Sequence, residues 1–169
     1  MNKIKIIDDF IESQDIESFI SSVDLLYKNQ KIEEGFLNRY CKINCEDETV
    51  ISIVKKYSEK LIKNNPGQFL VEYMPGLSFE GAYQPPHTDM EGETNFSMSA
   101  IMYFNEDFEG GEIFFPRIKY EYKPKTGSIV FFDPRIEEDH THEVKKIIKG
   151  RRYFCAMWFS TDKSRQLDL

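Results

Sequence analysis

Three histidines and one aspartate are the residues of this chain whose types and spacing suit metal chemistry. The histidines are His87, His140 and His142, and the chain has no others. Asp89 follows His87 by two positions. In extended backbone, residues i and i+2 point to the same face, so one ion is within reach of both side chains. The alternative without a metal site is a surface histidine beside a solvated carboxylate.

A second histidine completes a possible metal-ligand set with His87 and Asp89. His142 lies 55 residues after His87. Two neutral imidazoles and one carboxylate on one face of an octahedron are the ligand set of non-haem Fe(II) oxygenases. That set leaves three positions open on one side of the metal, whereas a four-ligand thiolate site leaves none. His140 is the alternative second histidine, because it lies two residues from His142 and can share its face.

Arg152 is a candidate anion-binding residue. It opens an apolar, strand-like run and lies ten residues after His142. A guanidinium grips a carboxylate through two parallel hydrogen bonds. Close to the metal, it would hold the distal carboxylate of a dicarboxylic 2-oxo acid such as 2-oxoglutarate. The alternative is an arginine that ends a turn on the surface.

The elements that must position these residues fall into a helical part and a β part. Ser13 is predicted to cap a helix over 13–28, whose apolar residues recur at helical spacing. A second helix is predicted over 47–63 and ends before Pro66 and Gly67. The predicted strands span 69–74, 97–104, 112–115, 128–132 and 152–160. Turn signals separate them, among which are Pro75-Gly76, Pro85-Pro86 and Gly110-Gly111.

These patterns predict an α+β protein that is mainly β. Closely spaced short strands with glycine and proline between them are typical of a sandwich or jelly roll. The helices are expected to pack on one outer face of a sheet. We therefore expect a single domain over 1–169, in which residues 1–66 form a helical support and residues 67–162 form the β core.

Composition excludes several classes of protein. The net charge of −7 at pH 7 disfavours nucleic-acid partners, because an acidic surface repels phosphate backbones. Three cysteines, an odd number, do not indicate a disulfide framework. No apolar stretch is long enough for a membrane span, and Asp8 and Asp9 interrupt the place where a signal peptide has its apolar core. We expect a soluble cytoplasmic protein.

Five blocks of sequence resemble, in order and spacing, the prolyl 4-hydroxylase-like family of Fe(II)/2-oxoglutarate-dependent oxygenases. The blocks are Tyr73-Met74-Pro75-Gly76, His87-Thr88-Asp89, 101–105 with 108–112, 123–132, and His142-Glu143-Val144 with Gly150-Arg151-Arg152-Tyr153 and Trp158. They cover about the last hundred residues of the chain. This set is far more specific than a histidine and an aspartate two positions apart.

The resemblance implies a double-stranded β-helix, a jelly-roll barrel with iron in its mouth. It implies Fe(II), 2-oxoglutarate and O₂ as requirements, with ascorbate as a reductant. The implied iron ligands are His87, Asp89 and His142, and the spacing to Arg152 favours His142 over His140. Arg152 would bind 2-oxoglutarate, and two tyrosines, Tyr73 and Tyr103, would line its pocket.

The activity that the resemblance implies is hydroxylation of an unactivated C–H bond, with release of succinate and CO₂. The expected substrate is proline in a protein or peptide, as for a prolyl 4-hydroxylase. Many members of the family carry an arginine near the substrate where this chain has Phe96. An apolar residue there suits a proline substrate held by other contacts, or a different substrate. Relatives that demethylate nucleic acids carry a second arginine where this chain has Trp158. The resemblance therefore does not favour nucleic-acid demethylation.

Two other functions stay open on the sequence. One is hydroxylation of a free amino acid or small molecule by the same chemistry. The other is a non-catalytic, cupin-like module that binds a metal or ligand. Arg152 discriminates against the module, which has no need for a buried cation at that point, and release of succinate would separate the two experimentally. No oligomeric state follows from the sequence.

Overall fold

The computed structural model describes residues 4–29, 34–35, 39–90, 95–136 and 140–169. Its helices are α1 (Ser13–Lys28), α2 (Glu48–Lys63) and the short 3-10 helix η1 (Lys163–Arg165). Among the described residues, no helix is long and apolar enough to cross a membrane. The remaining elements are strands, and every strand pairing in the described ranges is antiparallel.

Two sheets make up most of the β structure. The large sheet has the order β1 (Lys5–Ile7), β10 (Ile129–Phe132), β6 (Met98–Tyr103), β13 (Arg152–Ser160), β4 (Phe69–Ser78), β3 (Arg39–Cys41), β2 (Glu34–Gly35). The small sheet has the order β5 (Gln84–His87), β11 (His142–Val144), β8 (Ile113–Phe115), β9 (Tyr120–Tyr122). A separate pair joins β12 (Ile147–Lys149) to β7 (Glu109–Gly110).

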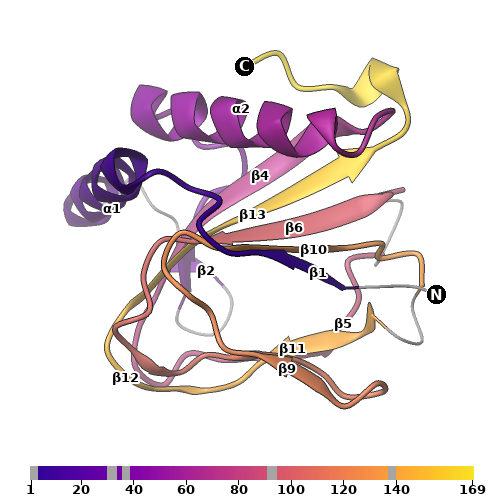
Figure 1. Cartoon of the computed structure of the whole chain (residues 1–169). Coiled ribbons are helices and arrows are strands. Elements are labelled where there is room, and N and C mark those ends of the chain that lie inside the picture. The colour runs from indigo at the N-terminus through magenta and orange to yellow at the C-terminus, as the bar shows by residue number, and fades with distance from the viewer. Residues whose placement is uncertain (1–3, 30–33, 36–38, 91–94, 137–139) are drawn as a thin grey trace.

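The long helices, the large sheet and the small sheet form three layers (Figure 1), and a hydrophobic core lies on each side of the large sheet. Both long helices cover one face of that sheet, and the small sheet lies beyond the other face (Figure 1). Buried Phe19 of α1 and Val54 of α2 belong to the cluster on the helix side. Phe115 and Phe132 belong to the cluster between the two sheets. The prediction of a mainly β protein with N-terminal helices packed on one sheet is confirmed.

The two long helices begin in different ways. Asp47 caps α2, because its side chain accepts a hydrogen bond of 3.0 Å from the backbone N–H of Val50. The prediction that Ser13 caps α1 is wrong, since Ser13 is the first helical residue and Glu12 precedes it as the cap. The side chain of Glu12 makes no capping bond, and its backbone N–H donates to the hydroxyl of Tyr57 on α2 at 2.8 Å. Contact with α2 therefore replaces a local cap.

Residues 1–66 are not helical alone. Strand β1 pairs with β10, and β3 pairs with β4, so this segment supplies strands to the large sheet. These strands have three residues each, too few for a period-two pattern to be recognised from sequence. Another difference concerns Pro75-Gly76, expected as a turn, which lies inside the ten-residue strand β4.

Strand β13 runs through the middle of the large sheet, between β4 and β6. Because side chains alternate along a strand, Cys155 and Met157 face the cluster under the helices. Arg152, Phe154 and Trp158 line a cavity on the opposite face. Alternation along this strand therefore gives the cavity between the sheets both a cation and aromatic walls.

Candidate metal centre

His87 and His142 meet across neighbouring strands of the small sheet. His87 ends β5, His142 begins β11, and the strand register pairs the two residues directly. Directly opposed residues of an antiparallel pair lie close together on one face. The centroids of their imidazole rings are 4.3 Å apart. Antiparallel pairing therefore brings together two histidines that are far apart in the sequence.

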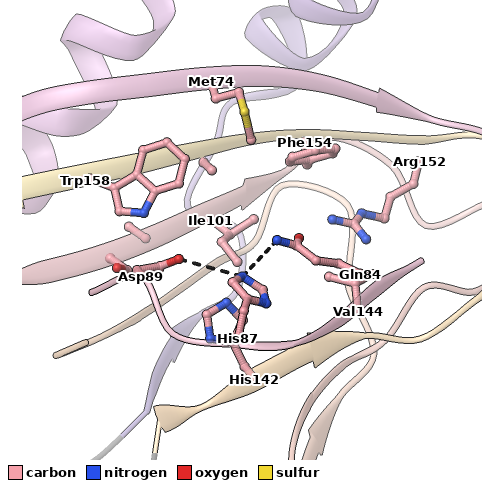
Figure 2. A pocket seen from close by; sticks show the side chains of 13 residues that line it. Met74, Gln84, His87, Asp89, Ile101, His142, Val144, Arg152, Phe154 and Trp158 are labelled. Atoms are coloured by element: carbon pink, nitrogen blue, oxygen red, sulfur yellow. Dashed lines mark hydrogen bonds and ion pairs between the residues drawn. The ribbon is translucent and has the colours of Figure 1, made fainter. Parts of the chain in front are cut away.

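Asp89 lies in a turn just after β5 and joins the two histidines. Its Oδ1 is 3.8 Å from Nε2 of His87, and its side chain is 11% exposed. The ligand atoms that His87, Asp89 and His142 offer all lie within 4.8 Å of one another. Figure 2 shows the three side chains near one another, with Asp89 on the side away from Arg152. The structure thus brings together the three residues predicted from sequence.

A β-bulge in β5 shapes this site. His87 pairs with His142 and Gln84 with Val144, so three steps along β5 match two along β11. The extra residue falls at Pro85-Pro86, which the sequence pattern predicts as a turn. Proline has no N–H, so the two prolines leave no unpaired donors where the ladder is interrupted. The bulge puts Gln84 and His87 on one face, although an odd separation would put them on opposite faces of a regular strand.

Backbone carbonyls fix the tautomers of both histidines. Nδ1 of His87 is 2.9 Å from the carbonyl oxygen of Pro85, and Nδ1 of His142 is 3.0 Å from that of His140. A carbonyl oxygen only accepts, so each Nδ1 carries the proton and donates it. Each Nε2 then keeps its lone pair for a metal.

Burial keeps His142 neutral. The residue is 3% exposed. Desolvation, opposed in part by the charge of Asp89, lowers the pKa of His142 to about 4. A metal ligand must be unprotonated, so the ring is ready to bind at neutral pH. Two imidazole nitrogens and one carboxylate suit ferrous iron.

His140 lies beside the site and not in it. Its side chain is 2% exposed, and its Nδ1 is 2.6 Å from the carbonyl oxygen of Asp133. The rings of Phe115 and Phe132 pack against its ring in T-shaped arrangements. It is absent from the cluster of three candidate ligands, and it contributes the carbonyl that orients His142.

The histidines and Asp89 open onto a cavity of about 220 Å³ that Arg152 also lines. Arg152 is 3% exposed, and its guanidinium carbon is 4.5 Å from the ring centroid of Phe154. Figure 2 shows Arg152 and Asp89 toward opposite sides of the cavity, with the histidines between them. A buried guanidinium and a metal-ligand cluster in one cavity suit a ligand with an anionic group at each end.

Tyr103, predicted to line the pocket, is not among the residues that line this cavity, but its ring lies near Arg152. The guanidinium carbon of Arg152 is 5.8 Å from the ring centroid of Tyr103. The hydroxyl of Tyr103 is buried and has no hydrogen-bond partner within the described residues. Desolvation raises the pKa of Tyr103 to about 12, so the hydroxyl keeps its proton. A buried donor without a partner suits an anionic ligand, because leaving it unsatisfied is costly.

The structure does not bring Tyr73 to the cavity. Its ring belongs to the cluster under the helices, and its hydroxyl donates to the carbonyl of Cys45. The neighbouring residue Met74 lines the cavity instead. The two residues point to opposite faces of β4, and an apolar run that is buried on both faces does not reveal its phase from sequence.

Sequence reasoning missed two polar residues of the site. Ser99 lines the cavity, and its buried hydroxyl has no hydrogen-bond partner in the described ranges. Gln84 also lines it, with its amide nitrogen 2.9 Å from Nε2 of His87. Nothing in the sequence marked Ser99. The paired prolines after Gln84 were the one available signal of a bulge.

Comparison with known proteins adds a family match. The model of the 2OG-Fe(II) oxygenase superfamily matches residues 70–160. Human prolyl 3-hydroxylase 2 is 39% identical over 69 residues, which cover 38% of this chain and 10% of the human protein. Its chicken counterpart is 41% identical over the same length. The match thus spans about a tenth of the length of these relatives.

Solved structures share the fold at low identity. A viral collagen prolyl hydroxylase from Paramecium bursaria Chlorella virus-1 has a TM-score of 0.73 and 18% identity, covering 95% of this chain and 96% of the other. A prolyl hydroxylase from Trichoplax adhaerens, solved with a peptide fragment of hypoxia inducible factor, has a TM-score of 0.78 and 19% identity. That alignment covers 98% of this chain and 86% of the other. The likeness extends beyond the segment that the family model matches.

Proposed function

The chain belongs to the 2OG-Fe(II) oxygenase superfamily, and from this premise we propose that it is a 2-oxoglutarate-dependent dioxygenase that hydroxylates proline in a protein or peptide. The observation that carries the proposal is one cavity lined by His87, Asp89, His142 and Arg152. The relatives reported above are named as prolyl hydroxylases, and one was solved with a peptide. These names support a peptidyl proline as the substrate.

The proposed iron site uses Nε2 of His87, a carboxylate oxygen of Asp89 and Nε2 of His142. Their ligand atoms are within 4.8 Å of one another, and both rings present a lone pair. When bound, Fe(II) supplies with 2-oxoglutarate and O₂ the oxidising power to hydroxylate a C–H bond, leaving succinate and CO₂. Ascorbate would serve as a reductant that keeps the iron ferrous.

Arg152 and Tyr103 are proposed to bind 2-oxoglutarate. Arg152 would pair with its distal carboxylate through two hydrogen bonds, and the Tyr103 hydroxyl would donate a further one. Both groups are buried, so they are ordered before the ligand arrives and their charge and dipole act in a medium of low dielectric. Together they fix which end of the dicarboxylate faces the metal site.

The apolar wall of the cavity would receive the substrate. Ile101 and Trp158 line the same cavity as Asp89, and Phe96 is buried against Trp158 with ring centroids 5.9 Å apart. Phe96 therefore supports Trp158 and brings no charge to the cavity. An aliphatic ring such as that of proline packs well against such surfaces, which also exclude water from the reacting centre.

The fold supports a finer proposal. The two facing antiparallel sheets would be the two halves of a double-stranded β-helix with residues 67–162 as its core. Residues 1–66 would support it through α1, α2 and the added strands, as parts of a single domain over 1–169. A single domain should unfold in one calorimetric transition. Two separate transitions would indicate two independent domains and contradict this proposal.

The test is to supply Fe(II), 2-oxoglutarate and ascorbate with a library of proline-containing peptides. The expected result is succinate release together with peptides heavier by one oxygen atom, with both signals absent in His142→Ala. Chromatography of the hydrolysed peptides would show whether carbon 3 or carbon 4 of proline carries the hydroxyl. Hydroxylation of free amino acids alone would favour the small-molecule hydroxylase. No consumption of 2-oxoglutarate with any pool would favour the binding module.

A further inference from the structure

Ser99 carries a buried hydroxyl that the proposed sites for iron and 2-oxoglutarate do not use. The residue is 2% exposed and lines the cavity that holds the candidate metal ligands. Its hydroxyl has no hydrogen-bond partner within the described residues. A buried hydroxyl without a partner lowers the stability of a fold, so native proteins keep few of them. A molecule that enters the cavity can supply the partner.

Ser99 lies toward the end of the cavity away from Arg152. The strand register pairs it directly with Trp158 of β13, and Figure 2 shows Trp158 on the side of Asp89, away from Arg152. Tyr103, whose ring lies near Arg152, follows Ser99 by four residues on β6, which is about 13 Å along a strand. A five-carbon dicarboxylate bound at Arg152 is shorter than this distance. Ser99 is therefore left for the second molecule of the reaction, the substrate.

The chemistry of proline indicates which group of a peptide the hydroxyl of Ser99 would meet. A proline within a peptide has no N–H of its own, and the peptide bonds on its two sides present carbonyl oxygens, which only accept hydrogen bonds. A serine hydroxyl offers one donor. Ile101 and Trp158 line the cavity together with Ser99 and give an apolar surface for the ring. One donor beside an apolar wall thus matches a carbonyl beside an aliphatic ring.

We propose that Ser99 is a specificity-determining residue whose hydroxyl donates a hydrogen bond to a carbonyl oxygen beside the target proline. The inference rests on the proposed function and names a polar contact for its peptide substrate. The contact lies next to Trp158, where the supporting residue Phe96 brings no charge. A serine that is present only for its small size would contribute nothing to peptide binding.

The experiment measures peptide affinity by the fluorescence of Trp158, the single tryptophan of the chain. The protein is loaded with Mn(II) and 2-oxoglutarate, so that no turnover is needed, and the probe is the proline peptide most strongly hydroxylated in the library test above. For Ser99→Ala we expect the dissociation constant of the peptide to rise about three- to tenfold, the range for loss of one hydrogen bond. The dissociation constant of 2-oxoglutarate should stay unchanged. The melting temperature should be equal or higher, because the variant removes a buried hydroxyl that has no partner among the described residues.

Ser97→Ala is the matched control. Ser97 is also buried and lies two positions earlier, but its hydroxyl is hydrogen-bonded to the side chain of Gln68 and, at 3.3 Å, to the carbonyl of Phe159. This variant should lower the melting temperature and leave the peptide affinity unchanged. The two serines are thus expected to separate fold stability from substrate binding.

Thioamide analogues of the peptide test the contact itself. Sulfur is a weaker acceptor than oxygen, so it replaces, one at a time, the two carbonyl oxygens beside the target proline. One analogue should bind wild type more weakly than the parent peptide does, and Ser99→Ala should not distinguish the two. Unchanged peptide affinity in Ser99→Ala, or equal sensitivity of both proteins to each analogue, would overturn the role of Ser99 and leave the proposed function intact. A wild-type protein that hydroxylates no peptide of the library would instead overturn the proposed function, and this inference with it.

Discussion

At the scale of single residues, the site is prepared by groups that are not ligands. The carbonyls of Pro85 and His140 select the tautomers of the two histidines. Burial then keeps the ring of His142 neutral. Such supporting contacts set both the orientation and the basicity of metal ligands. The candidate ligands are therefore arranged for metal binding by short-range backbone geometry.

Arg152 provides the sharpest test at this scale. Arg152→Gln would remove the proposed charge-assisted contact with the distal carboxylate of 2-oxoglutarate, and hydrogen bonds to a charged group are worth roughly 1.5–3 kcal/mol. The dissociation constant for 2-oxoglutarate should rise about 10- to 150-fold, measured by calorimetry on Mn(II)-loaded protein. Affinity for Mn(II) alone should stay unchanged. Arg117→Gln, an exposed arginine after β8, is the control, and equal losses in both variants would remove Arg152 from the binding site.

At the scale of elements, a glycine in β4 makes room for the aromatic ring that packs against Arg152. A Cβ placed on Gly76 would lie 2.1 Å from Cζ of Phe154, far inside contact distance. Phe154 in turn packs against the guanidinium of Arg152. We expect Gly76→Ala to displace the ring and weaken 2-oxoglutarate binding by about tenfold, as a displaced charged hydrogen bond would. The double variant Gly76→Ala/Phe154→Leu should recover part of the loss, and no recovery would contradict this packing account.

The contact between the helices is another element-scale feature. The Tyr57 hydroxyl accepts from the N–H of Glu12 at 2.8 Å and donates to Asp15 at 2.6 Å. Tyr57→Phe keeps the buried ring and removes both bonds, which should cost about 1–2 kcal/mol. For a chain of this size the melting temperature falls by about 2–4 °C per kcal/mol. Tyr83→Phe changes an exposed ring and is the control. An equal melting temperature for Tyr57→Phe and wild type would show that the two hydrogen bonds of the Tyr57 hydroxyl do not stabilise the fold.

Asp15 makes the same contact dependent on pH. Burial raises its pKa, but hydrogen bonds from Lys56 and Tyr57 outweigh this and hold the pKa below its usual value of 3.8. A lowered pKa in the folded state means that the carboxylate stabilises the fold above the unfolded pKa, and that this is lost as pH falls through the folded pKa. Asp15→Asn should therefore lower the urea midpoint at pH 7, and the difference should shrink at about pH 3. Asp168→Asn should show neither effect, and a constant difference across pH would contradict the ion pairing.

At the scale of the whole molecule, the sequence predicted what depends on spacing and periodicity. Types and intervals singled out four residues that the structure brings to one cavity, namely His87, Asp89, His142 and Arg152. The helix α2 was predicted from its apolar face and from the proline and glycine that follow it. Tyr73 was misplaced, because β4 is buried on both faces and its phase is hidden. Gln84 was missed because its place in the cavity depends on a bulge. A register shift depends on the partner strand, which one segment of sequence does not contain.

The proposed function requires that this chain bind Fe(II) and 2-oxoglutarate together at one centre. The most direct measurement is the visible absorption spectrum of the protein with Fe(II) and 2-oxoglutarate under anaerobic conditions. A metal-to-ligand charge-transfer band should appear with wild-type protein, require both additions, and vanish in His87→Ala. Absence of the band in wild type, or its survival in His87→Ala, would contradict the account.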